Sequence, residues 1–169
     1  MTPGELTAQA LLCDFAEVSG GKLFVSGAGI NLLATGQANA PHPVNFALAL
    51  LVRIPWTATN QQHTLIVELI SDSPDGGPRT VPINEADPPA GHEDKRGKIV
   101  ALFNAGRSPN MLAGEESLMP VAMPLAGLAL PDIGSYYFSV MIDGTEVDRV
   151  SFRLVSVLSM SGFPQPMQR

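Results

Sequence analysis

The segment from Leu130 to Val155 constrains the fold more than any other part of the sequence. Two runs in which large apolar side chains occupy every second position flank the pair Asp143-Gly144. Alternation with a period of two is typical of a strand with one buried face. Asp-Gly favours a tight turn, because glycine tolerates positive φ and aspartate can bond back to the backbone. The segment therefore predicts a β-hairpin. The apolar rows are Tyr136, Phe138, Val140 and Ile142 in the first run, and Val150, Phe152 and Leu154 in the second.

These two rows can share a face only if the hairpin is irregular. A two-residue Asp143-Gly144 loop would pair Phe138 with Arg149 and set an apolar row against a polar one. A one-residue shift of register turns the whole face of a strand over. We therefore expect an odd-length loop, or a bulge within Thr145–Arg149. Either would place Tyr136, Phe138, Val150 and Phe152 on one side.

Strand-like segments recur along the rest of the chain. The cleanest spans Val44–Ile54, where the even positions are all large and apolar and the odd positions are mostly small or polar. In Ser117–Leu130, Pro120 and Pro124 share one parity. Proline lacks the donor of a ladder hydrogen bond, so we expect an edge strand or an irregular one there. The other predicted strands are Gln9–Val18, Lys22–Ser26, Ile30–Leu33, His63–Ile70 and Lys98–Asn104.

This pattern predicts an all-β fold: a two-sheet antiparallel β-sandwich, immunoglobulin-like, with long Pro/Gly-rich loops. Asp72–Gly97 carries five prolines and many acids, and we expect a long excursion there. Gly134-Ser135-Tyr136 resembles the start of a strand in immunoglobulin-like sandwiches, where a tyrosine hydroxyl often holds the preceding loop. We expect one domain over residues 1–158 and an extended C-terminal tail over residues 159–169.

Composition argues against several classes of partner. The net charge is −6, and only 15% of the residues are charged. Nucleic-acid binding needs clustered Lys and Arg, so we expect none. No uninterrupted apolar run approaches the length of about 18 residues that a membrane-spanning helix needs. We also see no signal peptide, and expect a cytoplasmic or virion location. The single cysteine, Cys13, lies in an apolar run and is expected to be buried.

Several landmarks together resemble a known family. They are Asp14-Phe15-Ala16-Glu17-Val18 followed by Gly21-Lys22-Leu23, the strand Phe46–Val52 with Trp56, His63 opening a strand that contains Glu68, and the closing hairpin with Phe152. The chain resembles a family of small, functionally uncharacterised bacterial proteins, seen also in phage and actinobacterial genomes. The similarity covers about Ala8 to Val155. It implies a sandwich, and it implies no activity, substrate or catalytic residue.

The residues themselves carry no catalytic motif. A Ser-His-Asp triad stays open, because its members can lie far apart in a sequence, but no Gly-x-Ser-x-Gly elbow occurs. His92-Glu93-Asp94 lacks a second ligand pair at metal-binding spacing, and turn formation explains the loop acids that a calcium ion could use. We therefore predict no catalytic, cofactor-binding or metal-binding residue, and no cofactor. The loop acids are Asp72, Asp75 and Asp87.

We expect a non-enzymatic structural protein that acts through contacts, as a component of a homo- or hetero-oligomeric assembly. Low charge and seven methionines suggest it, and a phage virion or similar particle is one setting. The expected partner contacts are Trp56, Phe163, Pro164 and Met167. The first alternative is a small-molecule or carbohydrate binding module, with Trp56, Tyr136 or Tyr137 as stacking residues. The second alternative is a hydrolase of unknown type.

Overall fold

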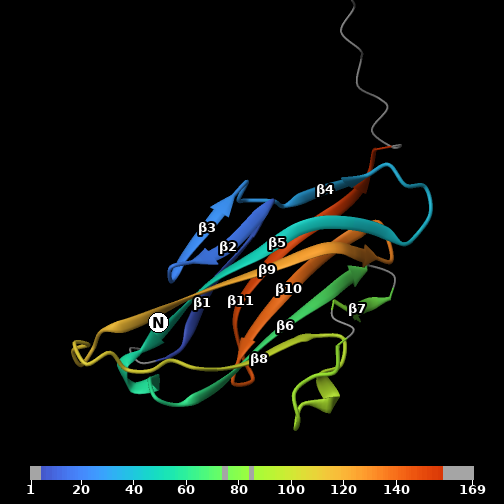
Figure 1. Ribbon diagram of the computed structural model, residues 1–169. Coiled ribbons are helices and arrows are strands. Elements are labelled where there is room, and N and C mark those ends of the chain that lie inside the picture. The colour runs from blue at the N-terminus through green and yellow to red at the C-terminus, as the bar shows by residue number, and fades with distance from the viewer. Residues whose placement is uncertain (1–4, 74–75, 84–85, 158–169) are drawn as a thin grey trace, which may run out of the picture.

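The computed structural model describes residues 5–73, 76–83 and 86–157, and these residues form an all-β fold (Figure 1). One sheet has three strands and a second has six, while two further strands make a separate hairpin. In the described part of the chain no helix is long and apolar enough to cross a membrane. The predicted tail over residues 159–169, with Phe163, Pro164 and Met167, lies outside the described residues.

The three-stranded sheet has the order β1 (Thr7–Cys13), β5 (His42–Pro55), β9 (Glu116–Leu130). The larger sheet has the order β4 (Leu32–Thr35), β11 (Thr145–Ser156), β10 (Gly134–Ile142), β6 (Gln62–Ser73), β7 (Gly77–Val81), with β8 (Ile99–Asn104) also on β6. The separate hairpin consists of β2 (Phe15–Ser19) and β3 (Lys22–Ser26). Two short 3-10 turns complete the elements, η1 (Trp56–Ala58) and η2 (Glu93–Lys95).

The main core lies between the three-stranded and the six-stranded sheet. Both contribute every second side chain, as the period-two pattern of β5 and β10 predicted. Burying one such side chain stabilises the fold by about 1.5–3 kcal/mol. Four rings pack at the centre: Phe46 of β5 lies edge-on to Phe138 and Phe152, and Tyr136 stacks on Phe152 at 5.4 Å.

The closing hairpin contains the predicted bulge. Tyr136 pairs with Phe152 and Phe138 with Val150, and the register shifts near the turn so that Val147 has no partner on β10. The buried rows of β10 and β11 therefore face the same side. The Tyr136 hydroxyl also donates to the Asp132 carbonyl at 2.6 Å and accepts from the Asp132 amide. This is the tyrosine tether that the sequence suggested.

Three strand predictions were wrong in detail. The run predicted as one strand over Gln9–Val18 breaks at Asp14 into β1 and β2, which belong to different sheets. The expected excursion after Asp72 contains β7, paired with β6. The six-stranded sheet is not purely antiparallel, because β4 runs parallel to β11.

The break at Asp14 depends on a glycine. The Asp14 amide donates to the carbonyls of Ser26 and Gly27, so the chain enters and leaves the β2–β3 hairpin at one point. Gly27 has a φ of +65°, and a Cβ there would lie 2.0 Å from the Asp14 carboxylate. A side chain at Gly27 would displace the Asp14 carboxylate and would be strained by the left-handed backbone, which glycine adopts freely. The hairpin thus folds over the outer face of β5, where Ala16 packs on Ala47 and Ala49.

The two long edges where the sheets meet differ. On one side β1 lies close to β11, and the Asp148 carboxylate accepts a 2.6 Å hydrogen bond from the Ala10 amide. On the other side β9 pairs only with β5 among the described residues, which confirms the predicted edge strand. Pro120 and Pro124 lie in continuous register with β5, so their missing donors face away from it, toward the free edge. A groove lined by Pro82, Ile83 and residues 124–129 follows this open side.

Candidate functional site

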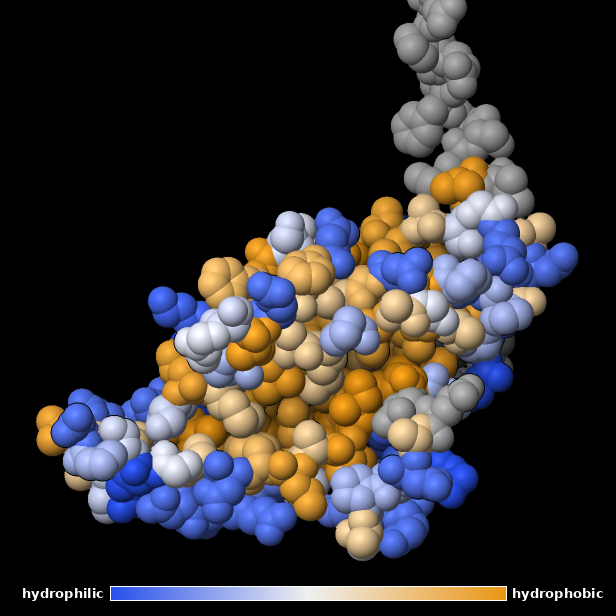
Figure 2. Space-filling view, in the orientation of Figure 1, coloured by the Kyte–Doolittle hydropathy of each residue, from blue (hydrophilic) through white to orange (hydrophobic). Residues whose placement is uncertain are grey.

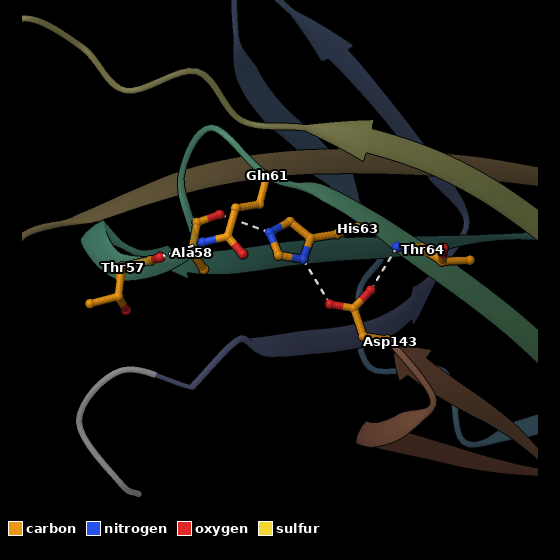
Figure 3. Close-up of polar contacts among 6 residues, drawn as sticks. All are labelled: Thr57, Ala58, Gln61, His63, Thr64 and Asp143. Atoms are coloured by element: carbon orange, nitrogen blue, oxygen red, sulfur yellow. Dashed lines mark hydrogen bonds and ion pairs between the residues drawn. The ribbon is translucent and has the colours of Figure 1, made fainter.

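His63 lies at the centre of a polar cluster in which its own ring is buried and its partner Asp143 is half exposed, at the end of the molecule where β6 begins (Figure 3). Its ring is 5% exposed. Nδ1 lies 2.7 Å from the Asp143 carboxylate, in the β10–β11 turn, and Nε2 lies 2.7 Å from the Ala58 carbonyl of η1. The second Asp143 oxygen accepts from the Thr64 amide at 2.9 Å. One imidazole therefore joins three elements.

The electrostatics of the cluster favour an ion pair. Burial lowers the pKa of His63, but the hydrogen bonds to the Ala58 carbonyl and the Asp143 carboxylate outweigh burial and hold this pKa above its ordinary value. Burial likewise raises the pKa of Asp143, and the hydrogen bonds from His63 and the Thr64 amide outweigh it and hold this pKa below its usual range. A histidine that donates from both nitrogens is an imidazolium.

This arrangement does not suit base catalysis. A catalytic histidine needs one nitrogen free to take a proton from a nucleophile. Both ring nitrogens of His63 are already bonded to acceptors, and neither bond goes to a serine hydroxyl. The contact between His63 and Asp143 was not predicted, because Asp143 was interpreted only as a turn residue. The two lie 80 positions apart, and no local pattern connects them.

A second polar cluster lies on the outer face of the six-stranded sheet. Lys98 forms a 2.8 Å ion pair with Glu68, and both side chains are largely buried. The Thr80 hydroxyl donates to the same Glu68 oxygen. Burial raises the pKa of Glu68, but the bonds from Lys98 and Thr80 outweigh it and lower this pKa overall. Every group in this cluster has a partner, which indicates a structural role.

Trp56, a predicted partner contact, lies in η1 and is half-buried. The Arg107 guanidinium covers its ring at 3.6 Å and donates to the Trp56 carbonyl and the Thr59 hydroxyl. One face of the indole is therefore taken by Arg107, which the sequence did not single out. Tyr136, a predicted stacking residue, is buried in the core, and the ring of Tyr137 carries Arg149 at 4.2 Å.

The other candidate ligands do not come together. His42 is buried at the start of β5, and its Nδ1 has no hydrogen-bond partner. His92 precedes η2. Among the described residues no three His, Cys, Asp or Glu side chains are placed to share a metal ion. Cys13 is buried, as predicted, and its thiol contacts the Ala47 carbonyl. Asp75 lies outside the described residues.

The β2–β3 hairpin carries apolar side chains on both faces. Its inner face, with Ala16 and Leu23, packs on the three-stranded sheet. Val25 pairs with Ala16 and Val18 with Leu23, so both valines are on this inner face yet remain partly exposed, while Phe15 and Phe24 are on the opposite face. Figure 2 shows apolar and polar residues mixed where the hairpin lies. We call these four residues the hairpin patch: Phe15, Val18, Phe24 and Val25, which are 38–55% exposed.

Comparison with known proteins places the chain in a family. The sequence profile of a family of unknown function, DUF6941, matches residues 8–155. The chain belongs to this family. The match confirms the resemblance to an uncharacterised family, and over nearly the same residues. A separate search found no match to this DUF6941 chain among curated proteins.

Solved structures resemble the chain only weakly. One is the Pseudomonas fluorescens alkylpurine DNA glycosylase AlkC bound to DNA containing an abasic site analog, at 8% identity and a TM-score of 0.42. Another is a β-glucosidase from Listeria innocua, at 10% identity and a TM-score of 0.43. The match covers 89% of this chain, but only 30% of the glycosylase and 16% of the glucosidase. At such scores the likeness says nothing about activity.

Proposed function

We propose that this DUF6941 protein is a non-enzymatic structural component of an oligomeric assembly and acts through protein contacts. The hairpin patch is the observation that carries the proposal. The hairpin attaches to the sheet beneath it through the face that carries Ala16 and Leu23, and it still leaves Val18 and Val25 partly exposed on that face and Phe15 and Phe24 exposed on the other. Contiguous exposed apolar surface on a folded domain commonly marks an interaction site.

The unpaired edge of β9 favours contacts through side chains over contacts through added backbone hydrogen bonds. β9 spans 15 residues and leaves one edge unpaired among the described residues, which is a template for strand addition. Pro120 and Pro124 remove two donors from that edge. Strand addition along β9 is thereby disfavoured, and the hairpin patch is the better interface.

Three finer expectations belong to the same proposal. We propose that the two larger sheets work as an immunoglobulin-like sandwich, with the β2–β3 hairpin as an addition. The resemblance to a family found in bacterial and phage genomes suggests a phage virion or similar particle as the setting, and hence a cytoplasmic or virion location. We further propose Trp56 and the tail residues Phe163, Pro164 and Met167 as additional partner contacts.

Size-exclusion chromatography with light scattering tests the proposal. We expect a mass above that of one chain, and a return to the monomer in a Phe15→Ser, Phe24→Ser variant that keeps its far-UV circular dichroism. The matched control replaces exposed apolar residues outside the hairpin, Leu112→Ser and Ile133→Ser, and should keep the wild-type mass. A wild-type protein that is strictly monomeric, and unchanged after deletion of residues 159–169, would contradict self-assembly.

A second candidate is a module that binds a small molecule or carbohydrate. A polar hollow on the outer face of the six-stranded sheet favours it, with Tyr137 at its wall. Its hydroxyl, amide, carboxylate and guanidinium groups could bind a polyhydroxylated ligand, and they belong to Asn31, Asp72, Ser135, Ser151 and Arg153. A thermal-shift screen of sugars distinguishes the two functions. A sugar that raises the melting temperature of the wild-type protein but not of the Asp72→Ala variant would favour the binding function over the structural one.

A further inference from the structure

The two contacts of the His63 ring require one N–H more than a neutral histidine has. A neutral imidazole has one N–H and one lone pair, so it can donate to one acceptor. Nδ1 faces the Asp143 carboxylate, and Nε2 faces the Ala58 carbonyl, each at 2.7 Å. Neither acceptor can donate in return at neutral pH. The geometry is satisfied only by the doubly protonated ring.

Among the residues that the structure describes, one further titratable group contacts the ring. From the β10–β11 turn this is Asp143, while β8 contributes the Phe103 ring at 5.3 Å and η1 contributes only the Ala58 carbonyl. Glu5, before β1, lines a hollow beside Asp143 together with Leu6, Ile142, Thr145 and Val147. The charge on the imidazolium is therefore balanced chiefly by Asp143.

Loss of one proton would break one of two anchors. If Nδ1 lost its hydrogen, a lone pair would face the carboxylate, and the β10–β11 turn would keep only its bonds to Thr64 as ties between Asp143 and β6. If Nε2 lost it, a lone pair would face the Ala58 carbonyl, and η1 would lose its bond to β6 while keeping its bonds to Arg107 and Glu115. The Asp143 side chain is 47% exposed, so water can replace the bond it loses, whereas the half-buried Ala58 carbonyl is the acceptor for which a lost donor is costly. The element carrying that acceptor is the one expected to move.

We propose that His63 is a pH-sensitive latch: as the imidazolium it ties η1 and the β10–β11 turn to the start of β6, and on deprotonation it releases one of them. The latch is independent of the proposed role in an assembly. It would make this end of the molecule, with Trp56 next to it in the chain, rigid in mild acid and loose in mild base.

The direction of the pH effect follows from the two shifted groups. The pKa of His63 is raised, so its stabilising contribution is complete below the unfolded value of about 6.5 and is lost as pH rises through the folded pKa. The pKa of Asp143 is lowered, so its contribution is complete above about 3.9 and is lost as pH falls through its folded pKa. The latch is closed between these limits.

Nuclear magnetic resonance on the full chain tests the latch. Imidazole ¹⁵N shifts report the protonation of His63, and hydrogen exchange reports two amides: Thr64, bonded to Asp143, and Asn60, bonded to the Ala105 carbonyl beside η1. We expect both ring nitrogens to be protonated at pH 6. One of the two amides should lose protection, beyond the intrinsic rate change, with the same midpoint as the imidazole.

Three variants make the result specific. Asp143→Asn keeps an acceptor and tolerates the φ of +50° at this position, so the turn should persist while the midpoint moves to lower pH. His63→Gln should show no midpoint in amide protection. His92→Gln removes a histidine elsewhere and should behave as wild type. A neutral His63 ring at pH 6, or amide protection that stays constant while the ring titrates, would overturn the latch.

Discussion

At the scale of single residues, polar side chains add to core packing in holding the end of the molecule near η1, where Ala58 packs against the main core. Arg107 is the clearest example. Its guanidinium covers the Trp56 ring and donates to two oxygens of the η1 region, while its own backbone amide donates to the Asn60 side chain. Planar, multi-donor geometry of this kind is specific to arginine, and lysine cannot reproduce it.

We predict that Arg107→Ala lowers the free energy of unfolding by about 1–3 kcal/mol, because a cation–π contact and two side-chain hydrogen bonds are lost together. Denaturant unfolding followed by circular dichroism measures it. The matched control is Arg96→Ala, whose ion pair with Asp87 is exposed on both sides and should contribute less than about 0.5 kcal/mol. Equal effects of the two substitutions would show that Arg107 does not hold η1.

At the scale of elements, two prolines on the free edge of β9 disfavour the addition of another strand, because proline has no backbone N–H donor. Pro120 and Pro124 share one parity with Ala122, and on this parity the backbone faces away from β5. Along the exposed edge the amide donor is therefore missing at Pro120 and Pro124 and present at Ala122 between them. A continuous row of donors and acceptors would attract a second strand, and natural edge strands commonly carry proline for this reason.

We predict that the Pro120→Val, Pro124→Val double variant stays folded and gains further, concentration-dependent association beyond the wild-type mass. Two donors return to the edge, and valine favours the extended backbone. Light scattering over a concentration series measures the effect. Ala129→Val, which adds apolar bulk at an exposed position of the same strand but no donor, is the control. A double variant that associates no more than this control would contradict the role of the prolines.

The same elements show what the sequence could and could not predict. The bulged hairpin was predictable, because two apolar rows and a turn leave only one consistent register. β7 was missed, because its sequence, Gly-Pro-Arg-Thr-Val, has no apolar alternation and gains its place by pairing with β6. The break at Asp14 was missed because apolar residues continue through it, and only the crossing with Gly27 reveals it.

The candidate site was less predictable than the fold. His63 and Trp56 could be singled out as residue types, but their partners come from distant turns, Asp143 and Arg107. Such contacts depend on how strands register across the whole sheet, and no short-range pattern encodes them. The exposed apolar residues of β2 and β3 were visible as strand residues, while their exposure required knowledge that the hairpin lies outside the main core.

At the scale of the whole molecule, one core joins two sheets. The main cluster takes side chains from β5 and β9 of one sheet and from β6, β10 and β11 of the other. Neither sheet can bury its apolar face without the other, so loss of one exposes the second. The edge between β1 and β11 is closed by Asp148 and the opposite edge is open at β9, which leaves the sheets joined mainly by this core.

We therefore predict that the described residues unfold as one cooperative unit. Trp56 is the only tryptophan and reports the η1 end by fluorescence, whereas far-UV circular dichroism reports all strands. The two denaturant transitions should coincide at each protein concentration, since self-association shifts both together. Leu48→Ala, at a fully buried position of β5, should lower both midpoints equally, by about 2–5 kcal/mol in free energy. Two outcomes would contradict this prediction: transitions that do not coincide, or a Leu48→Ala variant in which only one of the two midpoints falls. Either would mean that the two sheets fold independently and that the core between them is not the principal source of stability.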